Sequence, residues 1–162
     1  MNYIKLFEDF TSGTVYQNTS GQSFWGDCGA GVLPICSETK RILVPYRSLY
    51  VNEPHTWGIW GGKLDEEDIT IFDVAEREFI EETHYNGDIT LYPGYVFRAK
   101  GFEYHNFIGL LDNEFIPYLN WETESYKWIT FEELLKLEPK HFGLKALLND
   151  SKSMEMIKKY SL

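Results

Sequence analysis

The sequence of 162 residues has little of several features that mark particular classes of protein. Cys28 and Cys36 are its two cysteines, without a second pair to complete a metal site, so we expect free thiols packed as small apolar side chains. No apolar run approaches the roughly 20 residues of a membrane span. The start, MNYIKLFEDF, has neither a basic leader nor an uninterrupted apolar stretch. We therefore expect a cytoplasmic protein that does not enter a membrane.

Basic side chains are also scarce. The chain has 15 Lys and Arg against 25 Asp and Glu, a formal net charge of −10. Such a charge repels the phosphate backbone of nucleic acids and anionic membranes, which argues against a nucleic-acid-binding protein. A small anionic ligand would need metal ions or local Arg and Lys side chains to bind.

The chain lacks internal repeats, low-complexity tracts and Pro/Gly/Ser-rich linkers, so its length predicts a single domain over residues 1–162. Segments rich in β-branched and aromatic residues predict strands at 31–35, 41–46, 89–99, 104–111 and 126–129. Helical spacing of apolar residues predicts helices that begin at Ile71, run over 131–137 and cover much of 143–160. The elements interleave without strict alternation, which favours an α+β fold with a mixed sheet flanked by helices.

The helix that begins at Ile71 follows a predicted turn at Gly61 and Gly62. Thr70, with Asp73 three residues later, forms a capping-box pattern that sets its first residue. A similar pattern precedes the helix at 131–137. At 100° per residue, three apolar side chains of the first helix fall on one side and face a core: Phe72, Ala75 and Phe79.

The opposite side of this helix is crowded with charge. Arg77, Glu78, Glu81 and Glu82 occupy an arc of about 140°. Like charges at this spacing destabilise an isolated helix by a few tenths of a kcal/mol per pair, so a compensating partner is expected. Mg²⁺ or Mn²⁺ is the natural partner, because hard divalent cations prefer carboxylate oxygens. A solvated charged face is the alternative.

The spacing of these residues resembles the Nudix box, in which G, five residues, E and seven residues precede R-E-U-x-E-E-x-G-U, where U is a bulky aliphatic residue. The match covers Gly62, Arg77, Glu78, Glu81 and Glu82, with Phe79 in the first U position. Upstream, WGIWGGK at 57–63 is similar to the W-x-x-P-G-G-K of the family. The resemblance implies a single α/β/α sandwich and a metal-dependent pyrophosphohydrolase.

The sequence departs from this pattern twice. The loop between Gly62 and the helix is one residue longer, so Asp68 or Glu67 stands in for the loop Glu that orients the Arg in the family. Either would pair with Arg77 through two hydrogen bonds. His84 occupies the position of the Gly that ends the helix, where a positive φ would strain a residue with a side chain.

The resemblance implies that water cleaves a diphosphate that joins a nucleoside to a second group. Glu78 and Glu82 are the first choice for metal ligands, with Glu81 completing the set and the Gly62 carbonyl as a further ligand. Arg77, Glu78 and Glu81 belong to the predicted catalytic set. The general base lies within the box or at Glu122, in LNWETESYKW, with Glu124 as its competitor.

Predicted contacts to the substrate are Arg47, where the family often has a basic residue, Trp57, which can stack on a base, and Tyr104, near a tyrosine of the dinucleoside polyphosphate hydrolases. Tyr46, Trp60 and Phe102 are further stacking candidates, and the histidines at 55, 105 and 141 have no metal-ligand spacing. The predicted partner is a small nucleoside diphosphate derivative, and a homodimer is left open. Two alternatives are a Nudix-fold module that binds or senses a nucleotide without cleaving it, and an isopentenyl diphosphate isomerase.

Overall fold

One six-stranded sheet organises the part of the chain that the computed structural model describes, residues 28–99 and 102–162. The segment MNYIKLFEDF, and with it the predicted extension of the domain to residue 1, lies outside the described residues. The strands are β1 (Cys28–Cys36), β2 (Ile42–Arg47), β3 (Trp60–Lys63), β4 (Thr90–Ala99), β5 (Phe102–Leu111) and β6 (Thr123–Ile129). The order is β4-β5-β1-β2-β6, and β3 pairs with β1. Only β1 and β5 run parallel, so the sheet is mixed, as predicted.

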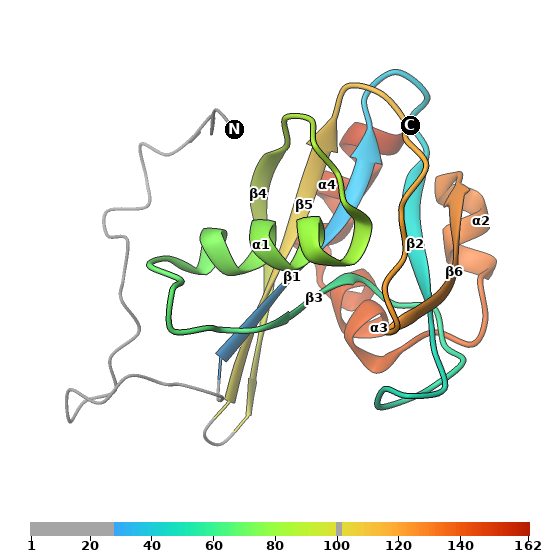
Figure 1. Cartoon of the computed structure of the whole chain (residues 1–162). Helices are drawn as coiled ribbons and strands as arrows, with labels where there is room; N and C mark the ends of the chain where they lie inside the picture. Colours follow the sequence, from blue (N-terminus) through green and yellow to red (C-terminus); the bar gives the residue numbers. More distant parts are fainter. Residues whose placement is uncertain (1–27, 100–101) are drawn as a thin grey trace.

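Helices cover both faces of this sheet (Figure 1). α1 (Ile71–Thr83) packs on β1 and β3 and closes one core. α2 (Phe131–Lys136), α3 (Phe142–Asn149) and α4 (Ser151–Ser161) close the second core on the opposite face. The predicted α/β/α sandwich is therefore confirmed.

Strand β1 separates the two cores, and all nine of its residues are buried. Ala30 and Val32 point to the core under α1, while Leu33 and Ile35 point to the core under α3 and α4. On this second face, Gly29 and Gly31 have no side chains. The ring of Tyr104, from the neighbouring β5, occupies the space that Cβ atoms at these glycines would take. The cavity described below lies next to this ring, over the middle of the sheet.

Two predicted elements differ from the structure. The predicted Gly61-Gly62 turn is part of strand β3, because both residues pair with β1. The segment predicted as one helix over much of 143–160 is two helices, α3 and α4. They separate at Asp150, whose Oδ2 accepts a hydrogen bond from the Ser153 N–H at 2.9 Å and so caps α4.

The expectation of free, packed thiols agrees with the structure. Cys28 and Cys36 are free and buried. Within residues 28–99 and 102–162, no helix has the length and apolar composition needed to cross a membrane.

Candidate active site

The start and end of α1 set the directions of its charged side chains. Thr70 and Asp73 form the predicted capping box, and the helix begins at Ile71. At the other end, His84 has φ 56° and ψ 28°, the left-handed conformation that glycine adopts most easily. Its Nδ1 lies 2.9 Å from the Tyr118 carbonyl oxygen, and its ring packs edge-on against the Tyr118 ring. These contacts stabilise His84 in the left-handed backbone conformation that was expected to be strained.

Glu82 is the most deeply buried carboxylate of the predicted cluster, with 5% of its surface exposed. Among the described residues, its carboxylate accepts one hydrogen bond, from the Gly61 N–H at 3.1 Å. Burial raises the pKa of Glu82 well above its ordinary value, and the negative charges of Glu122 and Glu78 raise it further. The helix therefore places a poorly compensated carboxylate against the glycines of β3.

Glu78 lies one helical turn before Glu82 and against the same strand. A Cβ on Gly62 would approach the carboxylate carbon of Glu78 to 2.5 Å, so any larger residue would displace this carboxylate. Burial raises the pKa of Glu78 above its ordinary value, although the hydrogen bond from Arg77 Nη1 at 2.9 Å opposes this shift. Gly62 thus lies where α1 approaches β3, whereas a Cβ on the preceding Gly61 would meet the Ala30 carbonyl oxygen of β1 and the Tyr104 hydroxyl.

Arg77 connects the long loop to the helix. Its Nη2 donates to Asp68 Oδ2 at 2.8 Å and to the Lys63 carbonyl oxygen at 2.8 Å, and its Nε donates to Asp68 Oδ1 at 3.0 Å. The pairing with Asp68 raises the pKa of Arg77 above its ordinary value. Of the two loop acids left open by the sequence, Asp68 is the partner of Arg77.

Glu81 lies at the outer edge of the cluster. Its side chain is 56% exposed, and Arg77 Nη1 donates to its Oε2 at 3.2 Å. No group of three or more His, Cys, Asp or Glu within the described ranges is arranged closely enough to hold a metal ion. Of the predicted ligands, Glu78 lies against Gly62, Glu82 binds the neighbouring Gly61 N–H, and Glu81 is turned toward Arg77.

Glu122 comes from a part of the sequence far from helix α1. It directly precedes β6, and its backbone is fixed by hydrogen bonds to Asn120 Oδ1 and from the Ser48 N–H. Its negative charge contributes to raising the pKa values of both Glu78 and Glu82, so the three carboxylates interact electrostatically. Glu124 instead forms an ion pair with His55 at 3.3 Å.

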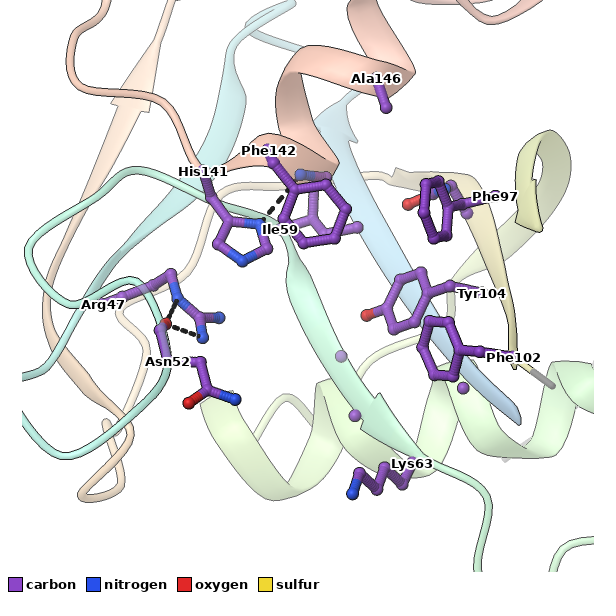
Figure 2. A pocket seen from close by; sticks show the side chains of 15 residues that line it. Arg47, Asn52, Ile59, Lys63, Phe97, Phe102, Tyr104, His141, Phe142 and Ala146 are labelled. Carbon is purple, nitrogen blue, oxygen red and sulfur yellow. Dashed lines mark hydrogen bonds between the residues drawn. The ribbon is translucent and has the colours of Figure 1, made fainter. Parts of the chain in front are cut away.

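A cavity of about 260 Å³ lies next to this cluster (Figure 2). Gly61, Gly62 and Lys63 form the border that the cavity shares with the carboxylates. Phe97, Tyr104 and Phe102 lie on one side of it, with His141 and Phe142 opposite. The remaining lining residues are Gly29, Arg47, Asn52, Ile59, Asn106, Gly143 and Ala146.

The model of the NUDIX domain matches residues 28–150, most of the chain and all of the site described above. The chain belongs to the Nudix family of pyrophosphohydrolases. A search of curated protein sequences found no match.

Solved structures show the same Nudix fold. A Nudix hydrolase from M. smegmatis, RenU, superposes with a TM-score of 0.70 at 20% identity, over 90% of this chain and 95% of that one. An Ap4A hydrolase from C. elegans gives a TM-score of 0.59 at 19% identity, over 82% and 95% of the two chains. The NUDIX domain of Shewanella oneidensis NrtR, complexed with ADP ribose, gives 0.58 at 15% identity, over 87% and 92%.

Two of the three predicted substrate contacts lie at the cavity. Arg47 and Tyr104 line it, and Nε of Arg47 donates to the Asn52 carbonyl oxygen at 3.0 Å. Burial raises the pKa of Tyr104, so its phenol stays protonated at neutral pH. Trp57 is buried in the core, where its ring packs at 4.8 Å from that of Tyr46. The structure does not bring Trp57 together with Arg47 and Tyr104.

Several residues of the cavity have no role in the sequence interpretation. Phe97 comes from β4, Asn106 from β5, and His141 and Phe142 from the start of α3. The rings of Phe97 and Phe142 meet edge-on at 5.5 Å. No spacing in the sequence connects these residues, because they meet only when α3 packs against β4.

Proposed function

We propose that this Nudix protein hydrolyses the pyrophosphate bond of a nucleoside diphosphate that is joined to a second group. The observation that carries the proposal is the position of the buried Glu82 carboxylate and the half-buried Glu78 carboxylate against the glycines of β3, at the border of an aromatic-lined cavity. Burying like charges together is costly unless a ligand compensates them. Binding of a cationic ligand at the active site would explain why the fold keeps these carboxylates close together.

Mg²⁺ or Mn²⁺ fits the donor set of this cluster. The buried carboxylate of Glu82 has one hydrogen bond and a raised pKa, which is the kind of oxygen ligand that a hard divalent cation stabilises. Glu78, Glu82 and the Gly62 carbonyl would hold the ion, with Glu81 joining if its side chain leaves Arg77. When bound, the ion would neutralise the negative charge that develops on the phosphate oxygens.

Arg77 holds the cluster in position. Its guanidinium is fixed by Asp68 and donates to Glu78, so the Glu78 carboxylate keeps one orientation toward Gly62. We assign Arg77 and Asp68 a positioning role, since their contacts run to the carboxylates and not to the cavity.

Glu122 is the proposed general base. Its charge contributes to raising the pKa values of Glu78 and Glu82, whereas its competitor Glu124 is paired with His55 at 3.3 Å. It takes a proton from water as the water oxygen attacks phosphorus, and the phosphorus–oxygen bond to the leaving phosphate breaks. Glu78 and Glu81 remain the competing candidates for the base within the helix.

The cavity is the proposed site of the nucleoside. Phe97, Phe102 and Phe142 supply apolar surfaces for a flat ring, and Tyr104 supplies a neutral phenol. Nε and Nη2 of Arg47 bind the Asn52 carbonyl oxygen, which leaves Nη1 for a phosphate oxygen.

A substrate panel tests the proposal. The protein is incubated with Mg²⁺ or Mn²⁺ and with Ap4A, ADP ribose, NADH, nucleotide sugars and nucleoside triphosphates, and phosphate is measured after phosphatase treatment. Ap4A and ADP ribose come first, because one structural neighbour is an Ap4A hydrolase and another is complexed with ADP ribose. The Glu82→Gln variant is the control for contaminating hydrolases.

We expect turnover of at least one compound by the wild type and a loss of that turnover in Glu82→Gln. Nucleotide binding without turnover of any compound would favour the sensing module. Equal turnover by both proteins would mean that the cluster is not the active site.

A further inference from the structure

Asn106 carries a buried hydrogen-bond acceptor that has no partner. The residue lies in the middle of β5 and is 3% exposed. Its Nδ2 donates to the Tyr95 carbonyl oxygen at 2.9 Å. Its Oδ1 is buried and has no hydrogen-bond partner among the described residues. Buried amide oxygens in folded proteins are nearly always paired, so this atom calls for an explanation.

The orientation of this amide is set by the neighbouring strand. Exchanging the oxygen and nitrogen would place Oδ1 against the Tyr95 carbonyl oxygen, and two acceptors cannot form a hydrogen bond. The flipped amide would lose its one bond and gain a repulsion. The group left unpaired is therefore an acceptor, and a ligand that pairs with it must be a donor.

Asn106 also lines the cavity proposed for the nucleoside. Side chains alternate along β5, so Tyr104 and Asn106 lie on the same face of the strand. Across from them, Gly29 and Gly31 of β1 leave room for the Tyr104 ring above the sheet. The phenylalanine rings of the cavity give a flat base surfaces to stack on, but they have no acceptor for the edge of the base.

His141 also lines the cavity, but its imidazole is not free to accept a hydrogen bond from a base. Its Nδ1 accepts a hydrogen bond from the Gly143 N–H at 3.1 Å, and its Nε2 lies 3.0 Å from Glu53 Oε2. Both ring nitrogens are therefore engaged within the protein. Asn106 Oδ1 is the buried acceptor that remains for a ligand.

We propose that Asn106 Oδ1 accepts a hydrogen bond from an exocyclic amino group at position 6 of a purine or position 4 of a pyrimidine, so that the protein prefers adenine to hypoxanthine nucleotides and cytosine to uracil nucleotides. Hypoxanthine and uracil carry an oxo oxygen at the same ring position, which Oδ1 repels. The inference rests on the proposed function, because it assigns the base within the same cavity. A site built to pair with an N–H group rejects the analogue that lacks it, since the buried acceptor then stays unpaired.

Calorimetry with non-hydrolysable ligands tests the preference apart from turnover. The α,β-methylene analogues of ADP, IDP, CDP and UDP are titrated into the wild type with Mg²⁺. We expect the ADP analogue to bind more tightly than the IDP analogue, the CDP analogue more tightly than the UDP analogue, or both. The expected difference in affinity is about 5- to 100-fold. Asn106→Leu, similar in shape but without the acceptor, should bring the ratio close to one. Asn52→Leu, which removes an exposed amide from the same cavity, should leave the ratio unchanged.

A ligand series keeps the test independent of folding in the variant. If Asn106→Leu does not fold, the wild type is titrated with analogues whose purine carries an amino group, a hydrogen or an oxo group at position 6. Affinity falling in that order supports the inference, and equal affinity for the three overturns it. A base preference that persists in a folded Asn106→Leu also overturns it. Binding of all analogues with equal affinity would overturn the base preference and leave the proposed function standing. If no analogue binds, both the base preference and the proposed function are overturned.

Discussion

Arg77 and Asp68 form a two-pronged ion pair, with Nη2 2.8 Å from Oδ2 and Nε 3.0 Å from Oδ1. The Asp68 side chain is 4% exposed, so the pair is shielded from water. The longer loop of this chain therefore does not leave the arginine without its acidic partner. It supplies that partner from Asp68, six residues after Gly62.

Asp68→Asn should lower turnover by about 10- to 100-fold, the usual effect of removing a residue that orients a ligand of the site. Asparagine keeps the size of the side chain but loses the charge that fixes Arg77, and Arg77 in turn positions Glu78. Glu67→Gln is the matched control, because Glu67 is an exposed acid of the same loop. Steady-state kinetics at saturating Mg²⁺ compares the two variants. Equal losses in both would show that the loop acts as a whole.

Glu82→Gln should stabilise the metal-free protein while removing its response to metal. The raised pKa of Glu82 means that its ionised form is unfavourable in the fold, whereas glutamine keeps an acceptor for the Gly61 N–H without the charge. Each kcal/mol gained raises the Tm of a domain of this size by roughly 2 to 4 °C. Added Mg²⁺ should raise the Tm of the wild type only.

Thermal unfolding with EDTA and with Mg²⁺ measures both effects, with Glu81→Gln as the comparison at the exposed edge of the cluster. An equal rise in Tm with Mg²⁺ in the wild type and in Glu82→Gln would remove Glu82 from the ligand set.

Most of the fold follows from local patterns. The capping boxes at Thr70 and Thr130 place the starts of α1 and α2 where the sequence predicts them. Strand β3 escapes prediction because Trp60–Lys63 contains two glycines and no alternation, and its identity as a strand comes from pairing with β1. The separation of α3 from α4 depends on one side chain, that of Asp150, within a continuous helical pattern.

The site likewise has a part that the sequence predicts and a part that depends on packing. Arg77, Glu78 and Glu82 lie on one helix at fixed spacing, so the motif predicts them together. The cavity combines β4, β5 and the start of α3, and the position of Phe142 opposite Phe97 depends on how α3 packs. Asn106 looks like an ordinary strand residue until its unpaired oxygen is seen in the structure.

His141 should make the protein sensitive to mild acid. Burial, together with the positive charge of Arg47, lowers the pKa of His141 from 6.5 to about 4. As the pH falls from 6.5 to 4, the unfolded chain takes up a proton that the folded protein does not, so stability is lost over this range. The side chain is 16% exposed, and the shift corresponds to at most about 3 kcal/mol.

The His141→Asn variant tests this, because asparagine does not titrate and can still accept the Gly143 N–H at the start of α3. Urea unfolding at pH 7.5 and pH 4.5 should show a smaller loss of stability in the variant than in the wild type. Parallel losses would mean that other groups account for the acid response.

Glu122→Gln should separate the two proposed locations of the general base. Glutamine is similar in size and cannot accept a proton, so kcat should fall by about 10² to 10⁴, while Mg²⁺ affinity and KM stay nearly unchanged. Glu124→Gln is the matched control, two residues away and paired with His55 at the surface. If Glu78 is instead both ligand and base, Glu78→Gln should weaken Mg²⁺ binding and turnover together, and Glu122→Gln should behave like Glu124→Gln.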